Sequence, residues 1–154
     1  MPKITPFLWF DSQAEEAMNY YLSIFKNGKL LSVNRVNGKV LTVTFELEGQ
    51  RIMALNGGPM FKFTEAVSLF VDCETQQEVD ELWDKLCADG GEPGRCGWLK
   101  DKYGLSWQII PKALMQLMGD PDPVKSKAVL EAMLKMNKIV IADLVKAYEG
   151  RSAA

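Results

Sequence analysis

Histidine is absent from this chain of 154 residues, and its absence removes several kinds of chemistry. Imidazole is the commonest metal ligand in proteins, and it is the side chain that most often exchanges protons near neutral pH. A Ser-His-Asp triad and a histidine-based zinc site are therefore excluded.

Cysteine is scarce, and the three that occur, Cys73, Cys87 and Cys96, do not have the spacing of metal ligands. An odd number without such spacing indicates reduced thiols, which are typical of the cytoplasm. No histidine can activate Cys96 as a nucleophile, so we expect a structural thiol there. Residues Met1 to Ile4 lack the charged and apolar segments of a signal peptide, which also favours a cytoplasmic protein.

Long apolar runs and an excess of positive charge are also missing. No run of about 18 apolar residues occurs, so we expect no membrane-spanning helix. The chain has 18 Lys and Arg against 20 Asp and Glu, a net charge of -2. Nucleic-acid binding needs clustered basic side chains to neutralise phosphates, so we expect no nucleic-acid partner. The remaining composition, 47% apolar and 25% charged, is that of an ordinary globular domain.

The most informative feature that is present is a pattern that occurs once in each half of the chain. In each half an apolar run ends in an aspartate and is followed by a Ser/Thr-x-x-Glu motif, at Ser12 and at Thr75. Each motif predicts a helix N-terminus with a capping box. The apolar stripes of the two helices also correspond, as Ala17, Tyr20, Tyr21 and Ile24 in the first and Val79, Leu82, Trp83 and Leu86 in the second. Because the strand-helix-strands pattern occurs twice, we predict two packed copies of one unit with a shared cleft.

Strands are predicted around these helices from residue alternation and turn signals. The first unit has expected strands at 3–10, 29–36, 40–48 and 51–55, with Asn37-Gly38 as a two-residue hairpin turn. The second has expected strands at 66–71, 95–100 and 105–110, and helical segments follow it. We therefore predict an α+β fold in one domain, 1–154, with unit one at about 3–56, unit two at about 66–111 and a helical tail at about 112–150. The tail should pack on the sheet or on a partner subunit, because such helices are unstable alone.

Residues 101–108, Asp-Lys-Tyr-Gly-Leu-Ser-Trp-Gln, form a motif with a known counterpart. They are similar to the Asp-Pro-Asp-Gly-Asn-x-x-Glu hairpin of vicinal-oxygen-chelate domains, the superfamily of glyoxalase I, bleomycin-resistance proteins and extradiol dioxygenases. More narrowly, the chain resembles the PhnB-like, or 3-demethylubiquinone-9 3-methyltransferase-like, branch in residues 4–10, 14–17, 45–58, 97–108 and 119–123. The resemblance implies a glyoxalase-like fold of paired βαβββ units, which agrees with the duplication.

Metal-binding relatives in this superfamily place ligands on four strands. The resemblance places three of these positions at Ala54, Ala66 and Gln108, and the fourth between Thr5 and Phe7. Two methyl groups and one amide cannot hold a divalent ion. We therefore expect neither a metal nor another cofactor.

Methyl transfer, which the name of the branch suggests, usually needs S-adenosylmethionine. That cofactor is commonly held by a glycine-rich turn that leads into a helix. Here Gly57-Gly58 is followed by Met60 to Phe63 and then by another strand, so the name has no chemical support in the sequence.

The segment Asn56–Phe63 is the main candidate for a ligand contact. It is either a mobile lid over an apolar ligand or only the crossover between the units. Phe7 and Trp9 share one face of their strand, and that face is either the cleft or the core. The resemblance sends Gln108 into the cleft. The candidate ligand-binding residues are therefore Phe7, Trp9, Asn56, Phe61, Phe63 and Gln108, and no catalytic residue can be named.

Three functions fit these observations. The first is a metal-free small-molecule-binding protein that forms a homodimer, since the concave sheets and the apolar tail need to be covered. The second is a metal-independent enzyme acting on a planar or quinone-like substrate. The third is a structural homodimer whose cleft has closed.

Overall fold

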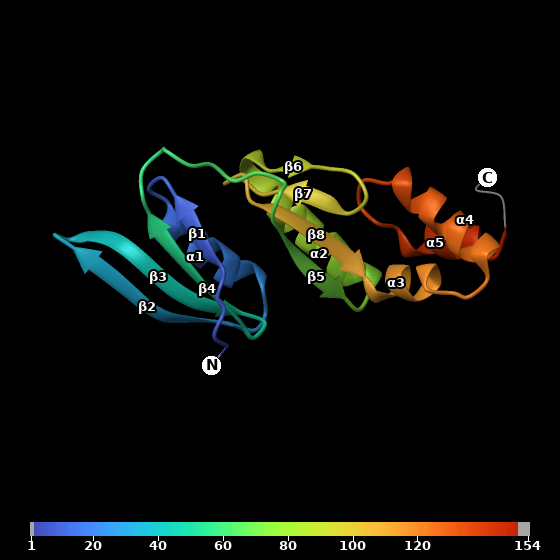
Figure 1. Ribbon diagram of the computed structural model, residues 1–154, viewed down its shortest axis with the longest axis horizontal. Coiled ribbons are helices and arrows are strands. Elements are labelled where there is room, and N and C mark those ends of the chain that lie inside the picture. The colour runs from blue at the N-terminus through green and yellow to red at the C-terminus, as the bar shows by residue number, and fades with distance from the viewer. Residues whose placement is uncertain (1, 151–154) are drawn as a thin grey trace. The chain divides into compact units, whose positions relative to one another are not determined.

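The computed structural model describes residues 2–150, and the chain divides between Phe63 and Thr64 into two compact units. The described part contains two four-stranded sheets and five α-helices, so the predicted α+β class is confirmed. In Figure 1 the first unit runs from blue to green and the second from green to red. No helix in the described range is both long and apolar enough to cross a bilayer.

The first unit has the predicted order of one strand, one helix and three strands. Its elements are β1 (Phe7–Phe10), α1 (Ala14–Ile24), β2 (Gly28–Val36), β3 (Lys39–Leu47) and β4 (Gln50–Asn56). The strand order in the sheet is β1-β4-β3-β2, and β1 is parallel to β4 while the other pairs are antiparallel. The turn between β2 and β3 is the predicted one, since Asn37 and Gly38 both have positive φ, 52° and 77°.

Helix α1 covers one face of the first sheet, where it forms the core of the unit. The rings of Tyr21 and Phe45 stack with centroids 6.4 Å apart, and both side chains are buried. Val43, Ile52 and Ala54 are buried with them. Residues of one parity on β3 and β4 thus lie against the helix, and residues of the other parity lie on the opposite face.

The second unit repeats this order with shorter strands. Its elements are β5 (Ser68–Cys73), α2 (Gln76–Cys87), the short 3₁₀ turn η1 (Ala88–Gly90), β6 (Glu92–Pro93), β7 (Trp98–Lys100) and β8 (Ser106–Pro111), in the sheet order β5-β8-β7-β6. The strand expected from Arg95 begins only at Trp98. The reason is a turn in which Cys96 and Gly97 both have positive φ, 58° and 84°.

The two predicted capping boxes have different outcomes. At α2 the prediction is confirmed, because the Thr75 hydroxyl accepts from the backbone N–H of Glu78 at 3.1 Å. At α1 it is wrong, because the helix begins after Gln13 and has no side-chain cap from Ser12. The backbone N–H of Ala14 instead donates to Oδ1 of Asn56, at 2.8 Å, from the end of β4.

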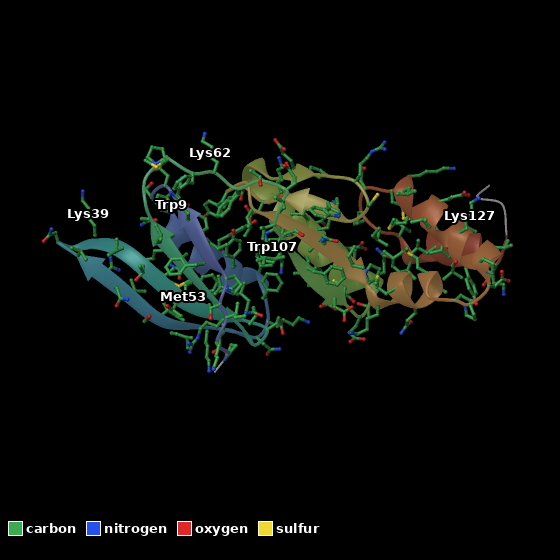
Figure 2. The ribbon with its side chains drawn as sticks, viewed as in Figure 1. Trp9, Lys39, Met53, Lys62, Trp107 and Lys127 are labelled. Carbon is green, nitrogen blue, oxygen red and sulfur yellow. The ribbon has the colours of Figure 1, made fainter. Side chains whose placement is uncertain are left out.

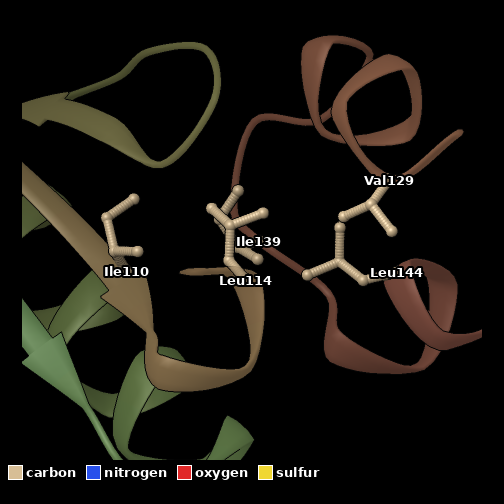
Figure 3. Packing of buried hydrophobic residues seen from close by; sticks show 5 residues of the cluster. All are labelled: Ile110, Leu114, Val129, Ile139 and Leu144. Atoms are coloured by element: carbon tan, nitrogen blue, oxygen red, sulfur yellow. The ribbon is translucent and has the colours of Figure 1, made fainter. Parts of the chain in front are cut away.

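The tail forms three helices, α3 (Lys112–Met118), α4 (Pro123–Leu134) and α5 (Ile141–Tyr148). They bury an apolar cluster that begins at Ile110 on β8 and continues through Leu114, Val129, Ile139 and Leu144. Figure 3 shows Leu114, Ile139, Val129 and Leu144 pointing toward one another. The tail is therefore part of the second unit's own core.

Candidate functional site

The face of the first sheet opposite α1 carries two of the predicted ligand contacts. No second helix occurs among the described residues of this unit, so no helix of the unit covers this face. Strand register places Phe7, Met53, Thr44 and Ser32 in one row, and Trp9, Leu55, Thr42 and Asn34 in the next. Figure 2 labels Trp9 and Met53 on this unit. The face is thus apolar on β1 and β4, and carries hydroxyl and amide groups on β3 and β2.

The segment Asn56–Phe63 lies against β1. Trp9 donates its indole N–H to the carbonyl of Gly58 at 2.9 Å, and its ring meets Phe61 edge-on with centroids 4.9 Å apart. Phe63 packs edge-on against Phe10 at 5.2 Å. Phe61 nevertheless remains 59% exposed, so it is a surface aromatic beside Trp9 and not a core residue.

Gly57 has a packing role that explains the glycine pair. A Cβ at this position would lie 2.3 Å from the ring of Trp9, so only glycine permits the close approach. The pair does not lead into a helix N-terminus, because the next element is β5. Gly57 therefore serves the packing of Trp9, while Gly58 has a positive φ of 87° and its carbonyl accepts from the Trp9 indole.

Both polar atoms of the Asn56 side chain make hydrogen bonds within the first unit. Its Oδ1 accepts from the backbone of Ala14 at 2.8 Å, and its Nδ2 donates to the carbonyl of Val40 at 3.2 Å. It also borders an open groove of about 640 Å³ on the first unit, lined by Asp11, Ser12, Glu15, Glu16, Val36, Lys39, Val40, Leu41 and Asn56. This groove shares only Asn56 with the predicted contacts, and Glu15 within it is paired with Arg35 at 2.9 Å.

The second sheet presents a comparable face on the side opposite α2. Strand register gives two rows across β5, β8 and β7, namely Ser68, Ser106 and Lys100 in the first and Phe70, Gln108 and Trp98 in the second. Gln108 donates from Nε2 to the Ser68 hydroxyl at 2.9 Å. Phe70 is 51% exposed beside it. Gln108 thus stands between two aromatic side chains, as a polar group on an otherwise apolar row.

A buried carboxylate holds the hairpin that carries this face. Asp101 is 2% exposed and accepts from the backbone N–H groups of Tyr103 and Leu105, at 2.9 and 3.1 Å. Its other oxygen accepts from the indole N–H of Trp107 at 2.9 Å. Figure 2 labels Trp107 on the second unit. In the sequence analysis we included Asp101 only as part of a motif and missed this role. An aspartate before a tight turn, followed by a tryptophan after the turn, was the pattern that could have indicated it.

The strand positions expected to carry a metal need one correction. Ala54 is buried against the α1 side, and the open-face residues beside it are Met53 and Leu55. Ala66 lies in the turn before β5. The corrected positions also lack carboxylate, thiolate or imidazole donors, so they do not fit the divalent ion of the superfamily. Within residues 2–150, no three His, Cys, Asp or Glu side chains gather in a way that could hold a metal.

Two of the three thiols, Cys73 and Cys87, are poorly placed for nucleophilic chemistry. Burial raises the pKa of Cys73 to about 12, helped by the charges of Glu78 and Asp72. Burial also raises the pKa of Cys87, with Asp84 nearby. A protonated thiol is a poor nucleophile, so neither cysteine is suited to covalent catalysis.

Comparison with solved structures defines the class of protein. A PhnB protein from Bacillus cereus, described as a 3-demethylubiquinone-9 3-methyltransferase, is 39% identical, with a TM-score of 0.67 over 71% of this chain and 99% of that chain. Protein PA1353 from Pseudomonas aeruginosa is 17% identical, with a TM-score of 0.62 over 72% and 98% of the two chains. The fosfomycin-resistance protein FosX from Listeria monocytogenes, solved with Mn(II) and sulfate, is 16% identical, with a TM-score of 0.51 over 70% and 88%. The fold is therefore that of the vicinal-oxygen-chelate superfamily.

The family is shown by a sequence model as well. The model of 3-demethylubiquinone-9 3-methyltransferase matches residues 2–110, and comparison with curated proteins finds no match. The chain belongs to this PhnB-like family. Helices α3, α4 and α5 lie beyond residue 110 and so outside the family match.

Proposed function

We propose that this protein binds a small organic molecule on the open faces of its sheets, without a metal or other cofactor, as a homodimer in the cytoplasm. The observation that carries the proposal is the make-up of these faces, where aromatic side chains stand in register with amide and hydroxyl groups. Ligand sites typically combine apolar walls with a few placed polar groups. On the face of the first unit we assign apolar contacts to Phe7, Trp9, Phe61 and Phe63, and on the face of the second unit we assign a polar contact to Gln108.

The metal-free part of the proposal is supported by the donor set. Met53, Leu55 and Ser68 occupy open-face positions of β4 and β5, and Gln108 occupies that of β8. These side chains offer a thioether, a hydroxyl and an amide, which are poor ligands for a divalent ion. About one tightly bound Zn, Ni or Mn per purified chain, found by elemental analysis, would contradict this part.

The homodimer is supported by apolar side chains that remain exposed in the single chain. Leu30 and Leu31 on the edge strand β2 are 50% and 37% exposed, and Leu134 on α4 is 50% exposed. Covering such side chains is favourable in water, and most soluble oligomers do so with twofold symmetry.

Native mass spectrometry of protein purified from its own cells tests both ligand and subunit number. We expect a dimer that retains a small molecule, released when the protein is denatured. A monomer at micromolar concentration contradicts the dimer. A protein that never carries a ligand, and whose melting temperature no member of a broad metabolite collection raises, contradicts the binding function.

The first prediction concerns the variants Phe61→Ala and Gln108→Ala. Each should weaken, at least several-fold, the binding of a ligand to the face that carries the substituted residue, while lowering the melting temperature little. Phe61 is largely exposed, so its removal should cost far less than the about 3–5 kcal/mol of a buried Phe. Titration calorimetry with the retained ligand measures the affinity, and a thermal melt measures stability.

Met115→Ala is the matched control, because Met115 on α3 is also 59% exposed but lies outside both open faces. We expect it to leave ligand affinity unchanged. If it weakens binding as much as Phe61→Ala does, or if Phe61→Ala unfolds the protein, the lid role of Phe61 is wrong.

A further inference from the structure

One hydroxyl on the open face of the second sheet has no protein partner. Ser106 is 1% exposed, and its Oγ makes no hydrogen bond within the described chain. Buried hydroxyls are nearly always paired, because an unpaired one loses the hydrogen bonds that water would have given it. The strand neighbours of Ser106 are Ser68 on β5 and Lys100 on β7, so the hydroxyl stands in a row of polar side chains.

An ion pair lies at the end of the sheet where β8 begins with Ser106. Lys100 on β7 pairs with Glu65, which precedes β5, and β8 lies between these two strands in the sheet. Lys100 is the strand neighbour of Ser106, so one member of the pair lies in the row that holds the hydroxyl. The side chains of Lys100 and Glu65 are 39% and 60% exposed, and ion pairs at such exposure contribute little to stability. An incoming anion can therefore replace Glu65 on Lys100 at little cost.

We propose that Lys100 and Ser106 form a subsite for the carboxylate of an aromatic acid, with Gln108 beside the ring of that acid and Glu65 as the internal anion that the ligand displaces. This inference rests on the proposed function, since it names the ligand class of the same open face. One carboxylate oxygen pairs with the Lys100 ammonium, and the Ser106 hydroxyl donates to the other. The ring lies on Phe70 and Trp98, which flank Gln108 in the adjacent row.

The chemistry of the row favours a carboxylate over a phosphate. Phosphate sites typically combine several donors, such as backbone N–H groups at a helix N-terminus or the fork of an arginine. Here one ammonium and one hydroxyl face a single half-exposed aromatic row, which suits a monoanion attached to a flat apolar group. The hydrogen bond with Glu65 raises the pKa of Lys100, so the amine is charged at neutral pH.

The second prediction is a titration with benzoate as the probe, followed by calorimetry at low salt. We expect wild type to bind benzoate, and Lys100→Met to weaken it at least about tenfold, because a charge-assisted contact is lost. Glu65→Gln removes the competing carboxylate and should tighten benzoate about three- to fivefold. Ser106→Ala should weaken benzoate about threefold or more, yet leave the melting temperature of the free protein unchanged or raised.

Matched controls come from an ion pair just beyond the ends of β5 and β8. Lys112 is paired with Asp72 and Glu74 at 2.5 and 3.3 Å, so Lys112→Met removes an equally paired ammonium outside the row. We expect Lys112→Met and Glu74→Gln to leave benzoate affinity unchanged. Benzyl alcohol, which has no charge, should bind wild type and Lys100→Met equally, and inorganic phosphate should not compete with benzoate.

Several results would overturn the subsite. One is equal benzoate affinity in wild type and Lys100→Met. Another is a loss of benzoate affinity in Glu65→Gln. The third is displacement of bound benzoate by inorganic phosphate at a similar concentration. If benzoate fails to bind while native mass spectrometry shows a neutral retained ligand that depends on Gln108, the carboxylate subsite is wrong and the proposed function stands. If neither ligand is found, both are wrong.

Discussion

Two buried polar residues on the same hairpin of the second unit are in opposite states. Asp101 accepts three hydrogen bonds and is fully paired, whereas Ser106, five positions on, has no protein partner for its hydroxyl. A paired buried carboxylate stabilises a turn, because one of its oxygens accepts from two backbone N–H groups that would otherwise be unsatisfied. We therefore assign Asp101 to structure and Ser106 to ligand binding.

The third prediction tests this assignment with Asp101→Asn. The amide keeps one acceptor for the backbone of Tyr103 and Leu105, but its NH₂ group then faces the indole N–H of Trp107, so two donors oppose each other. We expect a loss of about 1–3 kcal/mol in the free energy of unfolding, measured by urea denaturation.

Asp84→Asn is its control, since Asp84 is exposed on α2, and it should change the free energy of unfolding by no more than about 0.5 kcal/mol. Equal effects of the two substitutions would show that the Asp101 contacts are unimportant for folding.

At the scale of the elements, the two units differ in how their helices begin. Helix α2 is capped locally by Thr75, while α1 is capped from β4 by Asn56, 42 residues away in sequence. Local motifs therefore predict the start of α2 and fail for α1, because a tertiary hydrogen bond replaces the one that Ser12 was expected to make.

The fourth prediction compares Asn56→Ala with Ser12→Ala. Loss of Asn56 removes the acceptor for Ala14 and the donor to Val40, so we expect about 1–2 kcal/mol less stability and a melting temperature several degrees lower. Ser12→Ala should be close to neutral, because its hydroxyl does not cap α1. A larger loss for Ser12→Ala than for Asn56→Ala would contradict the cap described here.

Much of each unit follows from sequence patterns, and the errors have a common cause. Alternation in β3 and the Asn37-Gly38 turn predict the hairpin, since both depend on near neighbours. The assignment of Ala54 to the open face was wrong by one position, and in a strand a slip of one residue moves a side chain to the other face. Gln108 is the one half-buried residue of β8, between Phe70 and Trp98 in register, and burial along β8 does not alternate, so its role as a ligand contact stays a prediction from the resemblance.

At the scale of the whole molecule, the tail is joined to α2 of the second unit by hydrogen bonds of Gln76, which we call the clamp. Gln76, at the start of α2, donates from Nε2 to the carbonyl of Ile139 at 2.9 Å, and its Oε1 accepts from the backbone of Ile141 at 2.7 Å. Lys138 adds an ion pair with Asp80 at 2.9 Å. This docking could not be predicted, because a glutamine in the first turn of a helix has the pattern of a solvated residue. Its partners lie 63 and 65 residues away.

The fifth prediction is that Gln76→Ala releases the tail from α2. Alanine leaves the carbonyl of Ile139 and the N–H of Ile141 without partners in a half-buried place, so we expect about 2–4 kcal/mol less stability. Hydrogen exchange should accelerate most in residues 139–148, which are the two residues before α5 and the helix itself. Gln77→Ala is a close control, because the neighbouring glutamine donates to the exposed Glu81 at 3.2 Å on the same helix, and its loss should change neither stability nor exchange in the tail. If the two variants behave alike, the apolar cluster from Ile110 to Leu144 holds the tail by itself, and the clamp has no energetic role.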